Sequence, residues 1–266
     1  MKTCVALAGA LSALACSEAP SQPSGSSTRS EPISEMPGYV HVLGKSRFAL
    51  GQVSSQKSEF GVDKVIGEWG VFATHQTTRM VMGLPNSGAP PTLRPPLTGD
   101  AETHNAAVRA YLVGAGLQDD QIDSVSVNTS MSAGGTGTEP PDAWQLESYS
   151  SVIHRKFGSI PVVDSLATAT MNDLGESVNE TVYWPEIPRS VLEDATRFRA
   201  MLEDPKESAA FYEKLPAGAH GKLVIRHTPG TWAQAFQAVA AYDVDMSFGM
   251  TKHHDEGGNE ITLANE

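Results

Sequence analysis

Cysteine is nearly absent from this chain of 266 residues, which has only Cys4 and Cys16. Two cysteines so near the N-terminus cannot form a disulfide framework across the rest of the chain. Basic residues are also scarce: 19 Lys and Arg stand against 31 Asp and Glu, for a formal net charge of −12. Because nucleic-acid backbones and anionic lipid surfaces both require basic contacts, we expect neither nucleic-acid binding nor electrostatic docking on lipid.

Long apolar runs and the familiar catalytic motifs are missing as well. After Cys16 no segment is apolar for 18 residues, so we expect no membrane-spanning helix. The chain has no His-Glu-x-x-His pair for zinc, no Gly-x-Ser-x-Gly elbow and no Walker-type phosphate loop. We therefore expect no enzyme and no cofactor, and a hydrolase with a dispersed site is the least favoured hypothesis.

The N-terminus carries the clearest signal. Lys2 precedes an apolar run from Val5 to Ala15, which is typical of a secretory signal and too short for a span of about 20 residues. Ala13-Leu14-Ala15-Cys16 resembles the lipobox of bacterial lipoproteins. The resemblance implies cleavage before Cys16 and acylation of that cysteine, for example with palmitate. Ser17, in place of Asp, favours the outer membrane, on its periplasmic or surface side; an ordinary signal peptide with an incidental Cys16 is the alternative.

Composition divides the remaining chain into two parts. Residues 16–38 are rich in Ser, Pro and Glu and cannot form a core, so we expect a disordered tether after a signal peptide at residues 1–15. Whether this tether lifts the protein off the membrane or is simply disordered stays open. Residues 39–266 have the length of a single globular domain, and the chain's 40% hydrophobic content is ordinary for one.

Periodicity and turn residues predict strands with a few helices. A hairpin is expected within residues 69–84, and a helix over 101–114 between an Asp100 cap and a Gly116 C-cap. We expect strands at 122–131, 143–153, 162–171, 178–184 and 223–227, a helix opened by a Ser190–Glu193 capping box, another at Asp204-Pro205, and a last strand from Glu260. Residues 231–246 favour a strand, although a helix stays possible. This order predicts an α+β fold in which a helix packs on an antiparallel meander sheet, with added N- and C-terminal strands and a helical insert.

A family resemblance covers roughly residues 100–185. Gly158-Ser-Ile-Pro-Val162 precedes a strand that ends at the turn Asn172-Asp-Leu-Gly175. This arrangement resembles the PepSY and FTP-type modules of bacterial metallopeptidase propeptides, although any meander with such turns offers the same pattern. The resemblance implies a cystatin-like fold and a non-catalytic role: inhibiting, chaperoning or docking a peptidase or another envelope protein.

Two groups of side chains are candidate sites. His254 and Glu256 would share a face of an extended segment and could supply two metal ligands, where a structural metal site needs about four; a solvated loop is the alternative. The four tryptophans could form an exposed aromatic patch, but we expect them in the core: Trp69, Trp144, Trp184 and Trp232.

The functional hypothesis that combines these features is an exported, lipid-anchored, non-catalytic envelope protein. It would act by binding another envelope protein, with an edge strand accepting an extended peptide. A small-ligand or metal-binding lipoprotein is the alternative.

Overall fold

The computed structural model describes residues 50–78, 80–86, 96–97, 99–132, 144–228, 237–246 and 250–263. The helices within these ranges are α1 (Ala101–Ala115), α2 (Arg189–Glu203), α3 (Pro205–Tyr212) and a 3₁₀ turn, η3 (Asp119–Gln121). The strands are β1 (Val53–Glu59), β2 (Val62–Gly67), β3 (Gly70–His75), β4 (Val81–Pro85), β5 (Ile122–Ser132), β6 (Gln145–Phe157), β7 (Ile160–Met171), β8 (Ser177–Tyr183), β9 (Gly221–Thr228), β10 (Gln237–Asp245), β11 (Thr251–His254) and β12 (Glu260–Ile261).

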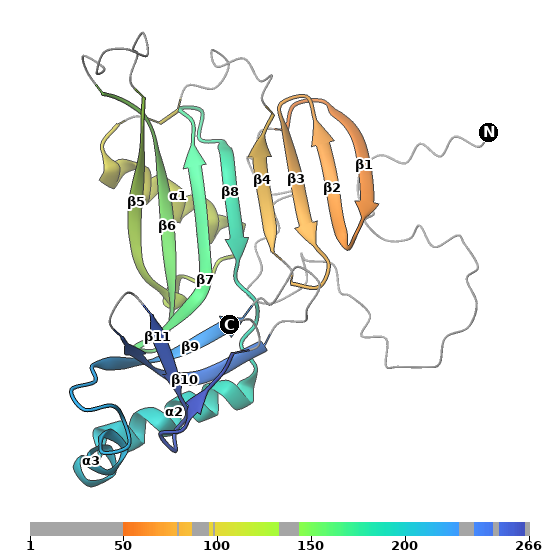
Figure 1. The fold of residues 1–266 in the computed structure, drawn as a ribbon. Coiled ribbons are helices and arrows are strands. Elements are labelled where there is room, and N and C mark those ends of the chain that lie inside the picture. The colour runs from red at the N-terminus through yellow and green to blue at the C-terminus, as the bar shows by residue number, and fades with distance from the viewer. Residues whose placement is uncertain are drawn as a thin grey trace, which may run out of the picture.

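Eight of these strands form one broad antiparallel surface (Figure 1). Its order is β1-β2-β3-β4-β8-β7-β6-β5, so the N-terminal meander joins the second meander where β4 pairs with β8. The turns that flank β7 are those expected from sequence. Gly158 has a φ of 58° in one, and the Asn172 side chain accepts the backbone N–H groups of Leu174 and Glu176 in the other.

Strand β7 is the point at which the sheet branches. From Leu166 onward it pairs with β8, whereas Val162 and Val163 pair in parallel with β9. Between these segments the register with β6 jumps from Val162 to Leu166, and Asp164 takes a φ of 65°. An irregularity of this kind bends a strand and re-aims its side chains. Because of this bend, β9 pairs with the edge of β7 at Val162 and Val163, where β8 does not pair. Strands β9 to β12 continue from there as a second antiparallel group.

The helices cover three clusters of buried apolar side chains, one under α1, one under α2 and one shared by α2 and α3. Helix α1 lies on one face of the main sheet, behind β5–β8 in Figure 1, and buries Val108 and Leu112 in a cluster that includes Ile153 of β6. Helices α2 and α3 cover β9 and β10, where Phe198 and Phe211 meet at 5.4 Å between ring centroids. Helix α1 therefore covers one group of strands, and α2 and α3 together cover the other.

The expected fold class is wrong. The chain is mostly β: a twelve-stranded mixed sheet dominates, with only three α-helices among the described residues, and the fold is not a helix packed on a meander sheet. The expectation failed because periodicity identifies strands but not their neighbours. The β4–β8 pairing and the branch at β7 depend on contacts between distant segments.

Several local predictions are confirmed. Helix α1 begins after Asp100, whose side chain accepts the N–H of Thr103, and ends at Gly116, whose φ is 124°. Asp204 caps α3 in the same manner, accepting the N–H groups of Lys206 and Glu207. The strand preferred within residues 231–246 is β10, for those of the residues that the structure describes.

The prediction of a capping box at Ser190 is wrong. Helix α2 begins at Arg189 behind Pro188, and no side chain caps its N-terminus. Pro188 is itself the N-cap residue, and its carbonyl accepts the N–H groups of Val191 and Leu192. The helix therefore opens one residue before the predicted cap, and Ser190 lies within the first turn.

Candidate functional site

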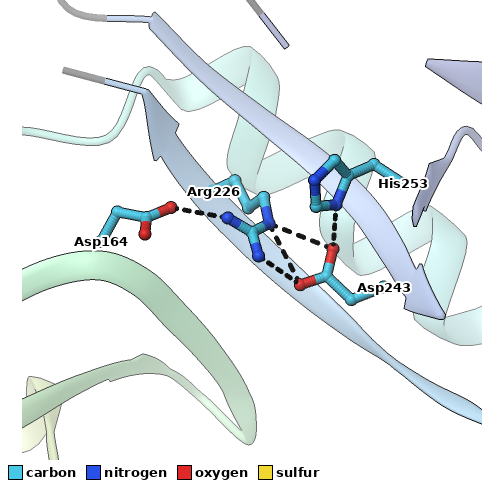
Figure 2. A network of polar contacts seen from close by, with 4 residues as sticks. All are labelled: Asp164, Arg226, Asp243 and His253. Atoms are coloured by element: carbon cyan, nitrogen blue, oxygen red, sulfur yellow. Dashed lines mark hydrogen bonds and ion pairs between the residues drawn. The ribbon is translucent and has the colours of Figure 1, made fainter. Parts of the chain in front are cut away.

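Four charged or titratable side chains meet where the two groups of strands join (Figure 2). Arg226 of β9 donates from Nη1 to Oδ2 of Asp164 at 3.0 Å, and its Nη2 lies 3.0 Å from Oδ2 of Asp243 on β10. The other Asp243 oxygen lies 2.7 Å from Nδ1 of His253 on β11. We call this set the junction network.

Local geometry explains why these side chains meet. Asp164 occupies the irregularity of β7, beside the parallel pair of Val163 with Arg226. Asp243 and His253 are direct cross-strand partners. Because side chains alternate along a strand, Asp243 points away from the face that carries Tyr242, which packs against α2 and α3. The network therefore fills the face of the second strand group that is turned toward β7.

Burial decides what the junction network can do. Asp243 is 4% exposed and His253 1% exposed, so this carboxylate–imidazole pair is closed to substrate in this structure. An imidazole oriented by a carboxylate is a known general-base arrangement, but a base must reach the proton it abstracts. Burial raises the pKa of Asp164, and the nearby Arg226 charge opposes that shift. The arrangement is thus suited to joining the strand groups, because buried charges persist where they are paired.

A second polar cluster lies beneath α1. The backbone N–H of Met171 donates to Nε2 of His104 at 3.2 Å, so Nε2 carries no proton. Nδ1 then holds the proton and donates to the Ser151 hydroxyl at 2.7 Å, which in turn donates to Oδ1 of Asn105. Burial lowers the pKa of His104, and this neutral tautomer satisfies the hydrogen bonds around it.

A buried carboxyl group faces the same helix. Oε2 of Glu180 accepts a hydrogen bond from the Tyr111 hydroxyl at 2.6 Å, while Oε1 is buried without a partner among the described residues. Glu180 is fully buried, and this burial raises its pKa. The fold therefore favours the neutral form of this carboxyl group.

The two predicted metal ligands lie in different local environments. His254 ends β11, is 4% exposed, and its Nδ1 has no partner among the described residues. Glu256 lies in the following turn and binds Arg197 of α2, with Oε2 2.8 Å from Nη2. Where the chain is described, no three or more His, Cys, Asp or Glu side chains are grouped to hold a metal. The metal site stays a prediction, but a solvated loop at these histidines is excluded.

The tryptophans do not share one environment. Trp184 is fully buried beneath the Arg155 guanidinium, 4.9 Å from its ring centroid, whereas Trp144 is 65% exposed. Trp69 is half-buried, and Trp232 lies outside the described residues. Cys16, the signal peptide and the tether also lie outside them, so lipidation stays a prediction. The structure has no helix in its described part that is long and apolar enough to cross a membrane.

The outer edge of β5 is a candidate binding surface. Among the described strands β5 pairs only with β6, and its eleven residues include one charged side chain, Asp123. The opposite edge, β1, carries Lys57 and Glu59. Natural sheets protect their edges with charges, prolines or short strands, and an unprotected edge is a template for another strand. In β5 the pairing register is regular from Ser124 to Ser130, so this edge is long and even.

Sequence reasoning missed the junction network. Its signal in the sequence was weak, because β9 also carries Lys222 and β10 also carries Asp245, so Arg226 and Asp243 do not stand out. Comparison of the chain with protein-family models, with curated proteins and with solved structures finds no match in any of the three.

Proposed function

We propose that this chain is an exported, non-catalytic protein, anchored to the outer membrane through a lipid on Cys16, that binds another envelope protein along the outer edge of β5. The long, nearly uncharged edge of β5 is the observation that carries the proposal. The resemblance of residues 100–185 to propeptide modules favours a peptidase as the partner.

Strand addition fits the chemistry of this edge. An unpaired edge presents backbone N–H and C=O groups in a regular row, and an extended peptide satisfies them without new secondary structure elsewhere. Each such hydrogen bond contributes about 0.5–1.5 kcal/mol net, so a segment of several residues gives useful affinity. Specificity comes from the side chains of alternate residues. On β5 these are Val125, Val127 and Thr129 on the α1 side of the sheet.

Lipidation is tested separately from binding. Cells that make the protein are grown with radiolabelled palmitate, and we expect label on the wild-type chain but not on Cys16→Ser. An unlabelled wild-type chain with a free thiol at Cys16 after secretion would contradict the anchor.

Photo-crosslinking tests the binding edge. A benzoylphenylalanine in place of Thr129 should give one discrete adduct with another protein on irradiation of intact cells. The matched control places the same group at Gln56 on β1, also exposed but on the opposite edge. Equal adducts from both positions, or none from Thr129, argue against the proposal. Because ligand binding raises thermal stability, a melting temperature several degrees higher with zinc would instead favour the metal-binding alternative.

A further inference from the structure

Exposed apolar side chains gather at one end of the main sheet. This end, uppermost in Figure 1, is where β1, β6 and β8 begin and where β4, β5 and β7 finish. In the described part of the chain eight large apolar side chains are exposed, and five of them lie at this end. We call it the apolar end, after these five members: Val53, Leu84, Met131, Trp144 and Leu174.

The five side chains extend across the full width of the main sheet. Val53 is on the outermost strand β1, Leu84 on the central strand β4, and Leu174 in the turn between β7 and β8. Met131 of β5 and Trp144, next to β6, lie at the other margin. Eight strands at standard spacing make this rim about 34 Å wide. Exposed fractions run from 43% for Met131 to 69% for Leu174, so the side chains project into solvent.

Width and charge together narrow the kind of surface that fits. The strand ends and turns of the apolar end include Glu68, Glu147 and Asp173 but, among the described residues, no Lys or Arg. Attraction to nucleic acid or to anionic lipid would need such cations. Apolar insertion into zwitterionic lipid does not need them. A fluid lipid surface also takes up each separated side chain individually, whereas a protein partner would need a matching site for each one.

The chain enters the described structure at this same end. The Leu50 carbonyl accepts the backbone N–H of Trp69, in the turn between β2 and β3, at 3.0 Å. Residues 17–49 separate Leu50 from Cys16, the proposed site of the acyl anchor. A random coil of this length spans roughly 30 Å, and a linker of this kind gives a roughly millimolar effective concentration. Weak insertion is therefore enough to hold the apolar end on the membrane.

We propose that the apolar end inserts its exposed side chains into the zwitterionic lipid surface of the membrane that carries the anchor. The inference rests on the proposed lipid anchor and adds an orientation to it. The strands of the main sheet point toward the membrane, and the second strand group, which joins at the opposite end of β7, lies farthest from it (Figure 1). The outer edge of β5 then faces sideways and stays accessible to a partner.

Vesicle binding tests this with the full secreted chain carrying Cys16→Ser, which has no acyl group and can bind only through its folded surface. Phosphatidylcholine vesicles with brominated acyl chains should quench its fluorescence, because Trp144 enters the lipid while Trp184 stays buried. Leu174→Ser should lower the partition coefficient about tenfold. The matched control is Met250→Ser, which removes a 61% exposed side chain next to β11 and should leave the partition coefficient unchanged.

Lipid composition separates insertion from electrostatic binding. Replacing part of the phosphatidylcholine with phosphatidylglycerol should weaken binding, because the carboxylates of the apolar end repel anionic lipid. Binding that instead increases with phosphatidylglycerol overturns the proposal. So does a chain that millimolar phosphatidylcholine does not quench, or an equal loss from Leu174→Ser and Met250→Ser, with circular dichroism confirming that each variant is folded.

Crosslinking in cells separates lipid from protein as the occupant. A benzoylphenylalanine in place of Leu174 should give lipid adducts on irradiation of intact cells. A discrete protein adduct from this position would assign the apolar end to a protein partner and overturn the proposal. The vesicle result does not depend on whether palmitate labels Cys16, because the chain tested has no acyl group. Failure of the anchor and failure of insertion are therefore separate outcomes.

Discussion

Replacing Arg226 with methionine removes the cation that lies between Asp164 and Asp243 while keeping much of its apolar stem. Asp243 would lose the guanidinium donors, whose Nε lies 3.2 and 3.1 Å from its two oxygens and whose Nη2 lies 3.0 Å from Oδ2. Its side chain is only 5% exposed, so water cannot replace these donors. We therefore expect a large loss of stability from a single substitution at the junction network.

The magnitude follows from the burial of each carboxylate. Removing one partner of a buried ion pair costs about 3–5 kcal/mol, because the other charge stays buried and uncompensated. His253 remains 2.7 Å from Asp243 and offsets part of this cost. Asp164 has a 39% exposed side chain and adds at most about 1 kcal/mol. The expected loss is about 3 kcal/mol, a large fraction of the 5–15 kcal/mol typical of folded proteins.

Urea unfolding at pH 7, followed by tryptophan fluorescence, measures this loss. Arg189→Met is the matched control, because Arg189 pairs with Glu193 on the surface of α2 with side chains 90% and 62% exposed, and should cost less than about 0.5 kcal/mol. Adding Asp243→Asn to Arg226→Met should recover about 1 kcal/mol or more by removing the orphaned charge. If Arg226→Met costs no more than the control, the junction network does not hold the strand groups together.

Three further substitutions test buried positions. Burial raises the folded-state pKa of Glu180, so its carboxyl stabilises the fold below the unfolded pKa and this contribution is lost as pH rises. Glu180→Gln should thus raise the free energy of unfolding by about 1 kcal/mol at pH 8 and by less at pH 5; an equal change at both values would contradict the shift. Burial lowers the folded-state pKa of His104, so its contribution is present above the unfolded pKa near 6.5 and is lost as pH falls. His104→Gln should flatten the decline in melting temperature between pH 7 and 5, and an unchanged slope would exclude His104 as its source. Phe198→Ala should lower the free energy of unfolding in urea by about 3–5 kcal/mol, because it leaves a cavity and also removes the edge contact with Phe211. A loss below 1 kcal/mol would mean that neighbouring side chains fill the cavity.

Local chemistry explains which elements could be predicted. The caps of α1 at Asp100 and Gly116 and the turn at Asn172 depend on residues within a few positions of each other. The capping box at Ser190 failed within the same short range, because Pro188 had already set the start of α2. Predictions succeeded where one local interaction dominated and failed where two competed.

The candidate sites were less predictable than the elements. The motif near His254 suggested metal ligands, but Glu256 is held by Arg197 from a helix 59 residues earlier in the sequence. At Arg226 and Asp243 the sequence shows charged residues but not their partners, because Asp164 lies 62 residues from Arg226 in the sequence.

By itself the sequence determined the acidic charge, the turns on either side of β7 and most strand positions, because these follow from composition and from neighbours along the chain. Only the tertiary structure decided that the sheet branches at β7 and that Tyr111 reaches Glu180, 69 residues away, and Asp164 reaches Arg226, 62 residues away. Such contacts depend on which strand edges meet and which faces the helices cover. Edge pairing minimises unsatisfied backbone groups over the whole molecule, so no single segment encodes it.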